Sequence, residues 1–95
     1  MIRIIARISA RSGAEAELRQ VLQALVLPSR AEPGCISYEL FQDDEHPADF
    51  ITFENWADRR AAETHLATEH VATAIAQAGN LLAQAPLIHR FTQLA

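Results

Sequence analysis

The sequence has 95 residues, 49% of them hydrophobic, and its 8 basic and 12 acidic residues give a net charge of −4. This length fits one domain over residues 1–95, and no basic patch interleaved with aromatics favours nucleic-acid binding. Cys35 is the only cysteine, which excludes an intrachain disulfide and a CxxC metal site. Because no apolar run reaches membrane-span length and no signal-peptide pattern is present, we expect a soluble, cytoplasmic chain without a membrane partner.

In the first segment, Ile2–Ser9, every second residue is isoleucine or alanine. This alternation predicts a strand with one well-buried face. Ser12, followed three residues later by Glu15, fits a capping box that begins a helix. The apolar residues of this helix have the spacing of a single stripe: Leu18, Val21, Leu22, Leu25 and Val26. We expect Pro28 and then Pro33–Gly34 to end the helix and turn the chain.

Two strand patterns follow, Cys35–Gln42 and Asp49–Trp56, and the polar, proline-containing segment Asp43–Ala48 reads as the loop between them. Alternation places the residues of the second strand on two faces: Phe50, Thr52, Glu54 and Trp56 on one, and Ile51, Phe53 and Asn55 on the other. Across this hairpin we expect Tyr38 and Phe53 to be near neighbours.

The last third of the chain predicts a second helix and a closing strand. Asp58 is placed to cap the helix. Its apolar pattern breaks near Thr68 and resumes as far as Gly79–Asn80, and Pro86–Leu94 reads as the final strand. The order βαββαβ predicts an α+β fold of the ferredoxin-like type, with a four-stranded antiparallel sheet and both helices on one face. Because the strands carry apolar residues on both faces, we expect a second sheet to cover the free face, and hence a homodimer.

The sequence predicts neither a metal site nor a cofactor. His65 and His70 are five residues apart, which on a continuous helix sets them roughly 140° from each other, whereas a helical metal pair is spaced by four. No G-x-S-x-G turn and no glycine-rich phosphate loop occur among the three glycines.

The remaining candidates for chemistry are one acid, two aromatics and one imidazole: Glu54, Trp56, Tyr38 and His65. Glu54 lies in a strand with several large apolar residues and needs a hydrogen-bond donor. Structural alternatives stay open at this point. A histidine on an apolar helix face is more often a core residue than a catalyst, Glu54 can pair with an arginine on an adjacent strand, and His65 can pair with Glu69 on the helix surface.

These residues resemble the antibiotic biosynthesis monooxygenase (ABM) domain family over about residues 2–91. Three pieces carry the resemblance, in this order: Pro33-Gly34-Cys35 with Tyr38; Phe50, Glu54, Trp56 and Asp58; and His65, Leu66 and His70. It implies a dimeric α+β barrel, in which two ferredoxin-like sheets pack face to face, with a pocket between sheet and helices. It also implies a monooxygenase that oxidises a quinol or a polycyclic aromatic phenol with molecular oxygen and needs neither metal nor flavin.

By position, the resemblance implies His65 and Glu54 as catalytic residues, and Trp56 and Tyr38 as substrate-binding residues. Asn55 is added as a further substrate-binding candidate because it is polar and adjacent to Glu54. His65 is the candidate base, because an imidazole titrates near neutral pH, and Glu54 would orient it. A non-catalytic or stress-response module that binds a small aromatic ligand, and a purely structural dimer, stay open as alternatives.

The family also contains haem-degrading members, which carry an asparagine in the first strand and a histidine late in the second helix. In this sequence Ala6 and Ile75 stand at those places, so we expect no haem.

Overall fold

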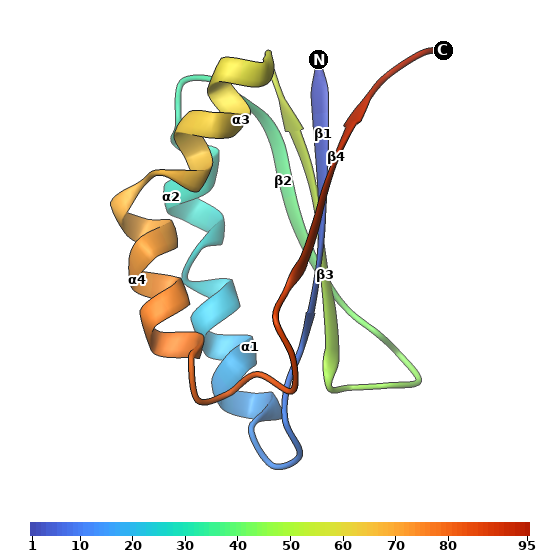
Figure 1. Cartoon of the computed structure of the whole chain (residues 1–95), viewed down its shortest axis with the longest axis vertical. Coiled ribbons are helices and arrows are strands. Elements are labelled where there is room, and N and C mark those ends of the chain that lie inside the picture. The colour runs from blue at the N-terminus through green and yellow to red at the C-terminus, as the bar shows by residue number, and fades with distance from the viewer.

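The computed structural model describes residues 1–95. Its elements are, in chain order, β1 (Ile2–Ser9), α1 (Glu15–Gln23), α2 (Val26–Arg30), β2 (Cys35–Gln42), β3 (Asp49–Trp56), α3 (Arg59–Leu66), α4 (Glu69–Ala78) and β4 (Leu87–Thr92). The strands form one four-stranded antiparallel sheet in the order β2-β3-β1-β4 (Figure 1). The predicted ferredoxin-like α+β fold is therefore confirmed. None of the helices combines the length and apolar character that crossing a bilayer requires.

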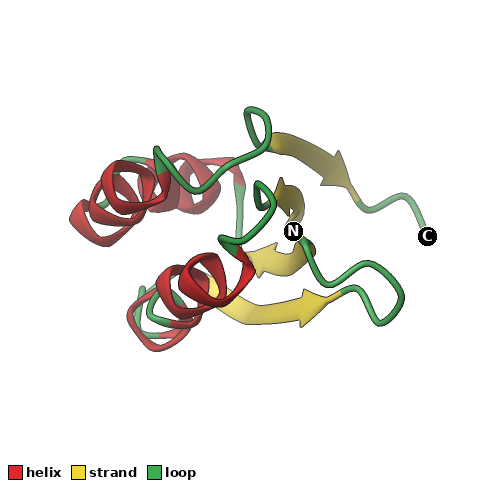
Figure 2. Cartoon of the chain, turned by 90° about the horizontal axis from the view of Figure 1, so that it is seen from below, coloured by secondary structure: helices red, strands yellow, loops and turns green.

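The helices form one layer and the sheet forms the other, so that one face of the sheet carries no helix (Figure 2). Within this arrangement α2 packs on β2, α3 packs on β1 and β3, and α1 packs against α4. The edge strand β4 is exposed along its whole length.

In the two central strands, the residues that face the helices are buried and alternate with less buried ones, as the sequence pattern predicted. In β1 the buried residues are Ile2, Ile4, Ala6 and Ile8, and in β3 they are Phe50, Thr52, Glu54 and Trp56. Each large apolar side chain removed from water in this way stabilises the fold by about 1.5–3 kcal/mol. A separate small cluster surrounds Trp56 and contains Ile2, Ile4, Tyr38 and Ala62.

The start and the end of the first helix differ from the sequence prediction. The chain turns through Gly13 at a φ of 89°, and α1 begins after Ala14 without any side-chain cap, so Ser12 does not form the predicted capping box. Pro28 lies inside the short helix α2 and does not end the first helix. Proline is tolerated there because N–H groups in the first turn of a helix have no intrahelical acceptor.

The second predicted helix divides into α3 and α4, and a side chain caps each of them. The Ala61 N–H donates to Asp58 Oδ1 at 2.8 Å, and the Val71 N–H donates to Thr68 Oγ1 at 3.4 Å. The predicted cap at Asp58 and the predicted break near Thr68 are both confirmed.

The hairpin register corrects one expected contact. Tyr38 pairs with Glu54, while Phe53 pairs with Glu39, with a register shift between Cys35 and Ser37. Tyr38 and Phe53 therefore lie on opposite faces of the sheet, because neighbouring residues of a strand point in opposite directions. The closing strand, β4, is also shorter than the predicted Pro86–Leu94 range.

Gly34, where the chain enters β2, allows the start of α3 to pack closely on this loop. A Cβ atom at Gly34 would collide with the Cβ of Ala61. We expect Gly34→Ala to lower the free energy of unfolding by about 1–3 kcal/mol, the usual cost of overpacking. Urea denaturation followed by circular dichroism measures this change.

Gly79→Ala is the matched control, because a Cβ atom there meets only ordinary van der Waals contacts at 3.6 and 3.9 Å. Gly79 has helical backbone angles, so alanine should be neutral or stabilise the protein by about 0.4–1 kcal/mol. Equal free energies of unfolding for the two variants would contradict the role given to Gly34.

Candidate active site

Glu54 is a carboxylic acid buried in the middle of the sheet, with 3% of its surface exposed. Thr52 Oγ1 donates to its Oε2 at 2.7 Å, and Trp56 Nε1 donates to its Oε1 at 3.0 Å. Both donors stand two residues away on β3, so the strand itself holds all three side chains on one face. Burial raises the pKa of Glu54, and the hydrogen bond from Thr52 is the strongest influence in the opposite direction.

His65, in the last turn of α3, lies against this group and is also 3% exposed. Its ring stacks on the indole of Trp56, with centroids 4.5 Å apart and planes inclined by 28°. His65 Nε2 is 3.5 Å from Glu54 Oε1, and the Tyr38 ring lies 5.7 Å away at 58°. The structure thus brings together His65, Glu54, Trp56 and Tyr38, four of the five predicted site residues.

Asn55 is the fifth, and the structure places it away from the others. Its Nδ2 donates to Ser37 Oγ at 2.7 Å, and its Oδ1 accepts from Arg3 Nε at 3.1 Å. Both contacts lie on the face without helices, because Asn55 follows Glu54 directly in the strand and points the other way. Asn55 cannot reach a ligand held between the sheet and the helices.

Glu32, between α2 and β2, belongs to the cluster and was missed by sequence reasoning. Its Oε2 lies 2.7 Å from His65 Nδ1 and 2.8 Å from His70 Nε2. An ionised carboxylate only accepts hydrogen bonds, so each imidazole donates to it. In the tautomer in which Nδ1 donates to Glu32, a neutral His65 ring keeps an unprotonated Nε2. No local sequence pattern identifies Glu32 as a site residue. It reaches His65 because the loop around Gly34 packs closely against the start of α3.

These contacts settle two of the structural alternatives. Glu54 does not pair with an arginine, since its partners are Thr52, Trp56 and His65. His65 does not pair with Glu69, since its Nδ1 is occupied by Glu32.

A cavity of about 380 Å³ lies between the sheet and the helices, in front of His65. Apolar residues make up most of its wall, and the polar groups gather at one end: Tyr38, Thr52, Glu54 and His65. An apolar pocket of this size with a few convergent polar groups is typical of small-molecule sites. Trp56 is completely buried and does not line the cavity, so it positions His65 from behind.

Tyr38 contributes a phenol to the cavity wall. Burial raises the pKa of Tyr38 above its usual range, and the nearby Glu54 carboxyl raises it further. The hydroxyl therefore stays protonated at neutral pH and can donate a hydrogen bond to a ligand oxygen.

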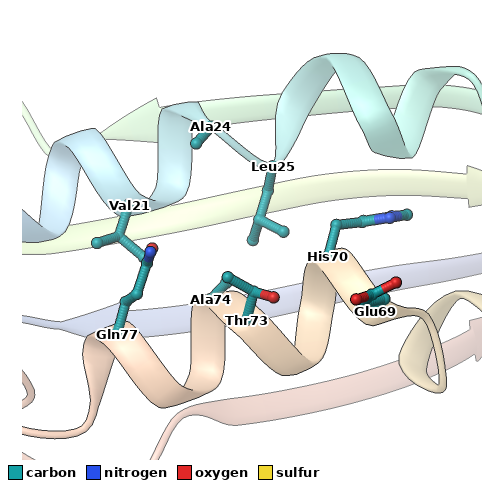
Figure 3. Close-up of a pocket in the computed structure, with 8 residues that line it drawn as sticks. All are labelled: Val21, Ala24, Leu25, Glu69, His70, Thr73, Ala74 and Gln77. Atoms are coloured by element: carbon teal, nitrogen blue, oxygen red, sulfur yellow. The ribbon is translucent and has the colours of Figure 1, made fainter.

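A second, more open hollow of about 430 Å³ lies between the helices, with Val21, Ala24 and Leu25 on one side and residues of α4 on the other (Figure 3). His70 and Glu69 mark one end of it. Neither His65 nor Glu54 lines this hollow. His70 does line it, and the Nε2 atom of His70 bonds to Glu32.

Three residues of the cluster could hold a metal ion: Glu32, His65 and His70, whose ligand atoms all lie within 4.8 Å of one another. The sequence argument against a metal site assumed a continuous helix from His65 to His70. The break at Thr68 changes the directions of the two rings, and both meet the same carboxylate.

The fold and this cavity define a small α+β domain with one enclosed acid–imidazole site. Residues 1–77 match the family described as antibiotic biosynthesis monooxygenase. The chain is 36% identical to Rv0793 of Mycobacterium tuberculosis over 81 residues, which are 85% of this chain and 79% of that protein. It is 34% identical to YcnE of Bacillus subtilis over 87 residues, which are 92% and 90% of the two chains.

Solved structures agree with these sequence matches. The crystal structure of PA3566 from Pseudomonas aeruginosa superposes with a TM-score of 0.92 and 39% identity, covering 99% of this chain and 94% of that one. The chain belongs to the antibiotic biosynthesis monooxygenase family.

The hydrogen bond from His65 to Glu32 generates a stability prediction. Glu32→Ala leaves the buried Nδ1–H of His65 without its acceptor. We expect the free energy of unfolding to fall by about 1–3 kcal/mol, the cost of an unsatisfied buried polar group. Glu32→Gln keeps one acceptor oxygen and should cost less. Urea denaturation of both variants, with Glu63→Ala in the exposed part of α3 as control, measures the effect, and equal values for Glu32→Ala and Glu63→Ala would contradict it.

Proposed function

We propose that this chain is a cofactor-independent monooxygenase that oxidises a quinol or a polycyclic aromatic phenol with molecular oxygen, and that His65 is its base. The observation that carries this proposal is the place of His65 in the wall of an apolar cavity, with Nδ1 beside Glu32 and Nε2 beside Glu54. Membership of the monooxygenase family supports the reaction class. Rv0793 and YcnE, the two relatives, each bear the name "Putative monooxygenase".

The site supplies what such a reaction needs from a protein. Ground-state oxygen reacts slowly with closed-shell molecules, but a deprotonated quinol or phenol is a good one-electron donor. In the proposed mechanism, Nε2 of His65 takes the hydroxyl proton, and the substrate anion passes an electron to oxygen inside the cavity. The Glu32 carboxylate stabilises the imidazolium through its bond to Nδ1. General-base assistance of this kind is worth about 10²–10⁴ in rate.

The remaining residues bind and orient the substrate in this proposal. The Tyr38 phenol donates a hydrogen bond to a substrate oxygen, and the apolar wall holds the flat ring system. Glu54 keeps the ring of His65 in place from the Nε2 side, and Trp56 does so through stacking. These are positioning roles, since Trp56 itself does not reach the cavity.

Oxygen consumption with menadiol, compared with autoxidation, tests the reaction. His65→Gln keeps a polar side chain of similar length but lacks a base, and we expect its rate above autoxidation to fall by about 10²–10⁴. His46→Ala is the matched control, because His46 is exposed in the loop between β2 and β3. An unchanged rate in His65→Gln would sink the proposed base, and no rate above autoxidation in the wild type would favour a module that only binds a small aromatic ligand.

We also propose that the protein is a homodimer formed through the free face of the sheet. That face carries six apolar side chains: Ile5, Phe41, Ile51, Phe53, Leu87 and Phe91. Three of them, Phe41, Leu87 and Phe91, are exposed, and Phe41 meets Phe53 edge to face at 5.7 Å. Six apolar side chains among polar ones, on a sheet face that no helix covers, are typical of an interface.

Light scattering at micromolar concentration tests the dimer. We expect the wild type to have twice the chain mass and Phe41→Glu, at a position that pairs with Ile51 and no cation, to shift toward the monomer, because a buried unpaired charge disfavours association. Leu27→Glu places the same charge on an exposed apolar residue of the helix layer and should remain dimeric. A folded wild-type monomer would contradict the proposal.

A further inference from the structure

We propose that Glu32, His65 and His70 form a binding site for a divalent ion of the zinc type, and that the bound ion removes the base from His65. The effect on the base rests on the proposed function, whereas the binding site for the ion does not. The ion would lie on the side of His65 that faces away from the cavity.

The three ligands come from separate segments and converge on one point. Glu32 lies between α2 and β2, His65 in the last turn of α3, and His70 in the first turn of α4. Glu32 Oε2 is 2.7 Å from His65 Nδ1 and 2.8 Å from His70 Nε2. The three ligand atoms lie within 4.8 Å of one another, so an ion bonded at about 2.0–2.2 Å to each would draw the two nitrogens together and displace the carboxylate oxygen outward.

The donor set fits zinc. Two imidazole nitrogens and one carboxylate oxygen are a common zinc environment, in which a water molecule completes a tetrahedral site. Imidazole nitrogen also favours zinc over magnesium or calcium, which prefer oxygen ligands.

The charge distribution also favours a cation. The carboxyl groups of Glu32 and Glu54 lie on either side of His65, and each has ion-pair contacts only with histidine. No arginine lies within ion-pair distance of either acid. The cluster therefore gathers two carboxyl groups with no arginine beside them, and this favours a bound cation.

Glu54 supplies the outer contact that metal-bound histidines usually have. A histidine that binds a metal through one nitrogen commonly donates the N–H of the other nitrogen to a carboxylate. His65 Nε2 faces Glu54 Oε1 at 3.5 Å. That carboxyl is held in place by Thr52 and Trp56, so the ring of His65 is already oriented for binding through Nδ1.

The ion has a route from solvent that avoids the cavity. His70 keeps 25% of its side chain exposed and lines the hollow between the helices, where its side chain extends from the start of α4 (Figure 3). The cavity wall includes His65 but neither Glu32 nor His70, and the hollow includes His70 but not His65. His65 thus separates the proposed ion from the substrate.

Binding at Nδ1 determines which tautomer His65 adopts. Without the ion, the Nδ1 proton bonds to Glu32, and Nε2 is free to accept a proton. With the ion on Nδ1, the single proton of the neutral ring lies on Nε2. His65 then donates toward Glu54 and can no longer take a proton from a substrate, so the ion acts as an inhibitor.

Isothermal titration of metal-free wild-type protein with Zn²⁺ tests the site without any substrate. We expect saturable binding of one ion per chain and, with Co²⁺ in its place, the visible absorption of a four-coordinate complex. His70→Ala should lower the affinity for Zn²⁺ by at least about tenfold, and His70→Gln, which keeps a donor to Glu32, should do the same with the fold intact. His46→Ala, which removes an exposed histidine elsewhere, should bind as the wild type does.

Two results would overturn the site: no saturable binding to the wild type, or equal affinity in the wild type and both His70 variants. Glu54→Gln gives a further arm, since loss of an outer-shell carboxylate weakens metal binding by about 10–100-fold. Circular dichroism of every variant separates loss of a ligand from loss of folding.

The inhibition is tested in the menadiol assay, with each protein compared with its own metal-free rate. We expect Zn²⁺ to slow the wild type, a chelator to restore the rate, and His70→Ala to need at least about tenfold more Zn²⁺. Calorimetric binding without any slowing would overturn the inhibitory role. If metal-free wild type does not oxidise quinols, the proposed function fails, while calorimetry still decides the metal site.

Discussion

The position of the His65 ring is the constraint on which the rest of the site depends. Trp56 stacks on one side of it, Glu32 binds Nδ1, and Glu54 faces Nε2. All four side chains lie in the interior or at its edge, where hydrogen bonds and charges are stronger than in water. The ring therefore has one orientation, with Nδ1 toward Glu32 and Nε2 toward Glu54.

Two short helices in place of one long helix make this arrangement possible. On a continuous helix the rings of His65 and His70 would point in different directions. Thr68 ends that continuity by capping α4, and both rings then reach the same oxygen of Glu32. A cap worth about 1 kcal/mol thus determines the geometry of a buried polar cluster.

The strand β3 shows how much of the site could be read from alternation. Its period of two correctly predicted that Glu54 and Trp56 share the buried face. The same period places Asn55 on the opposite face, where it bonds to Ser37 and Arg3. Its polarity and its place beside Glu54 suggested Asn55 as a site residue, but the strand turns it away from the cavity, because neighbouring residues of a strand point in opposite directions.

The sequence by itself determined the order of strands and helices, the buried face of β1, which residues of β3 share a face and the cap at Asp58, because these depend on neighbours a few residues away. Only the tertiary structure decided that Glu32 meets His65, that Trp56 lies behind the ring, and that one carboxylate joins two histidines. Glu32 and His65, for example, are more than thirty residues apart in the sequence. Their geometry depends on close packing, such as that of Gly34 against Ala61, which no local pattern encodes.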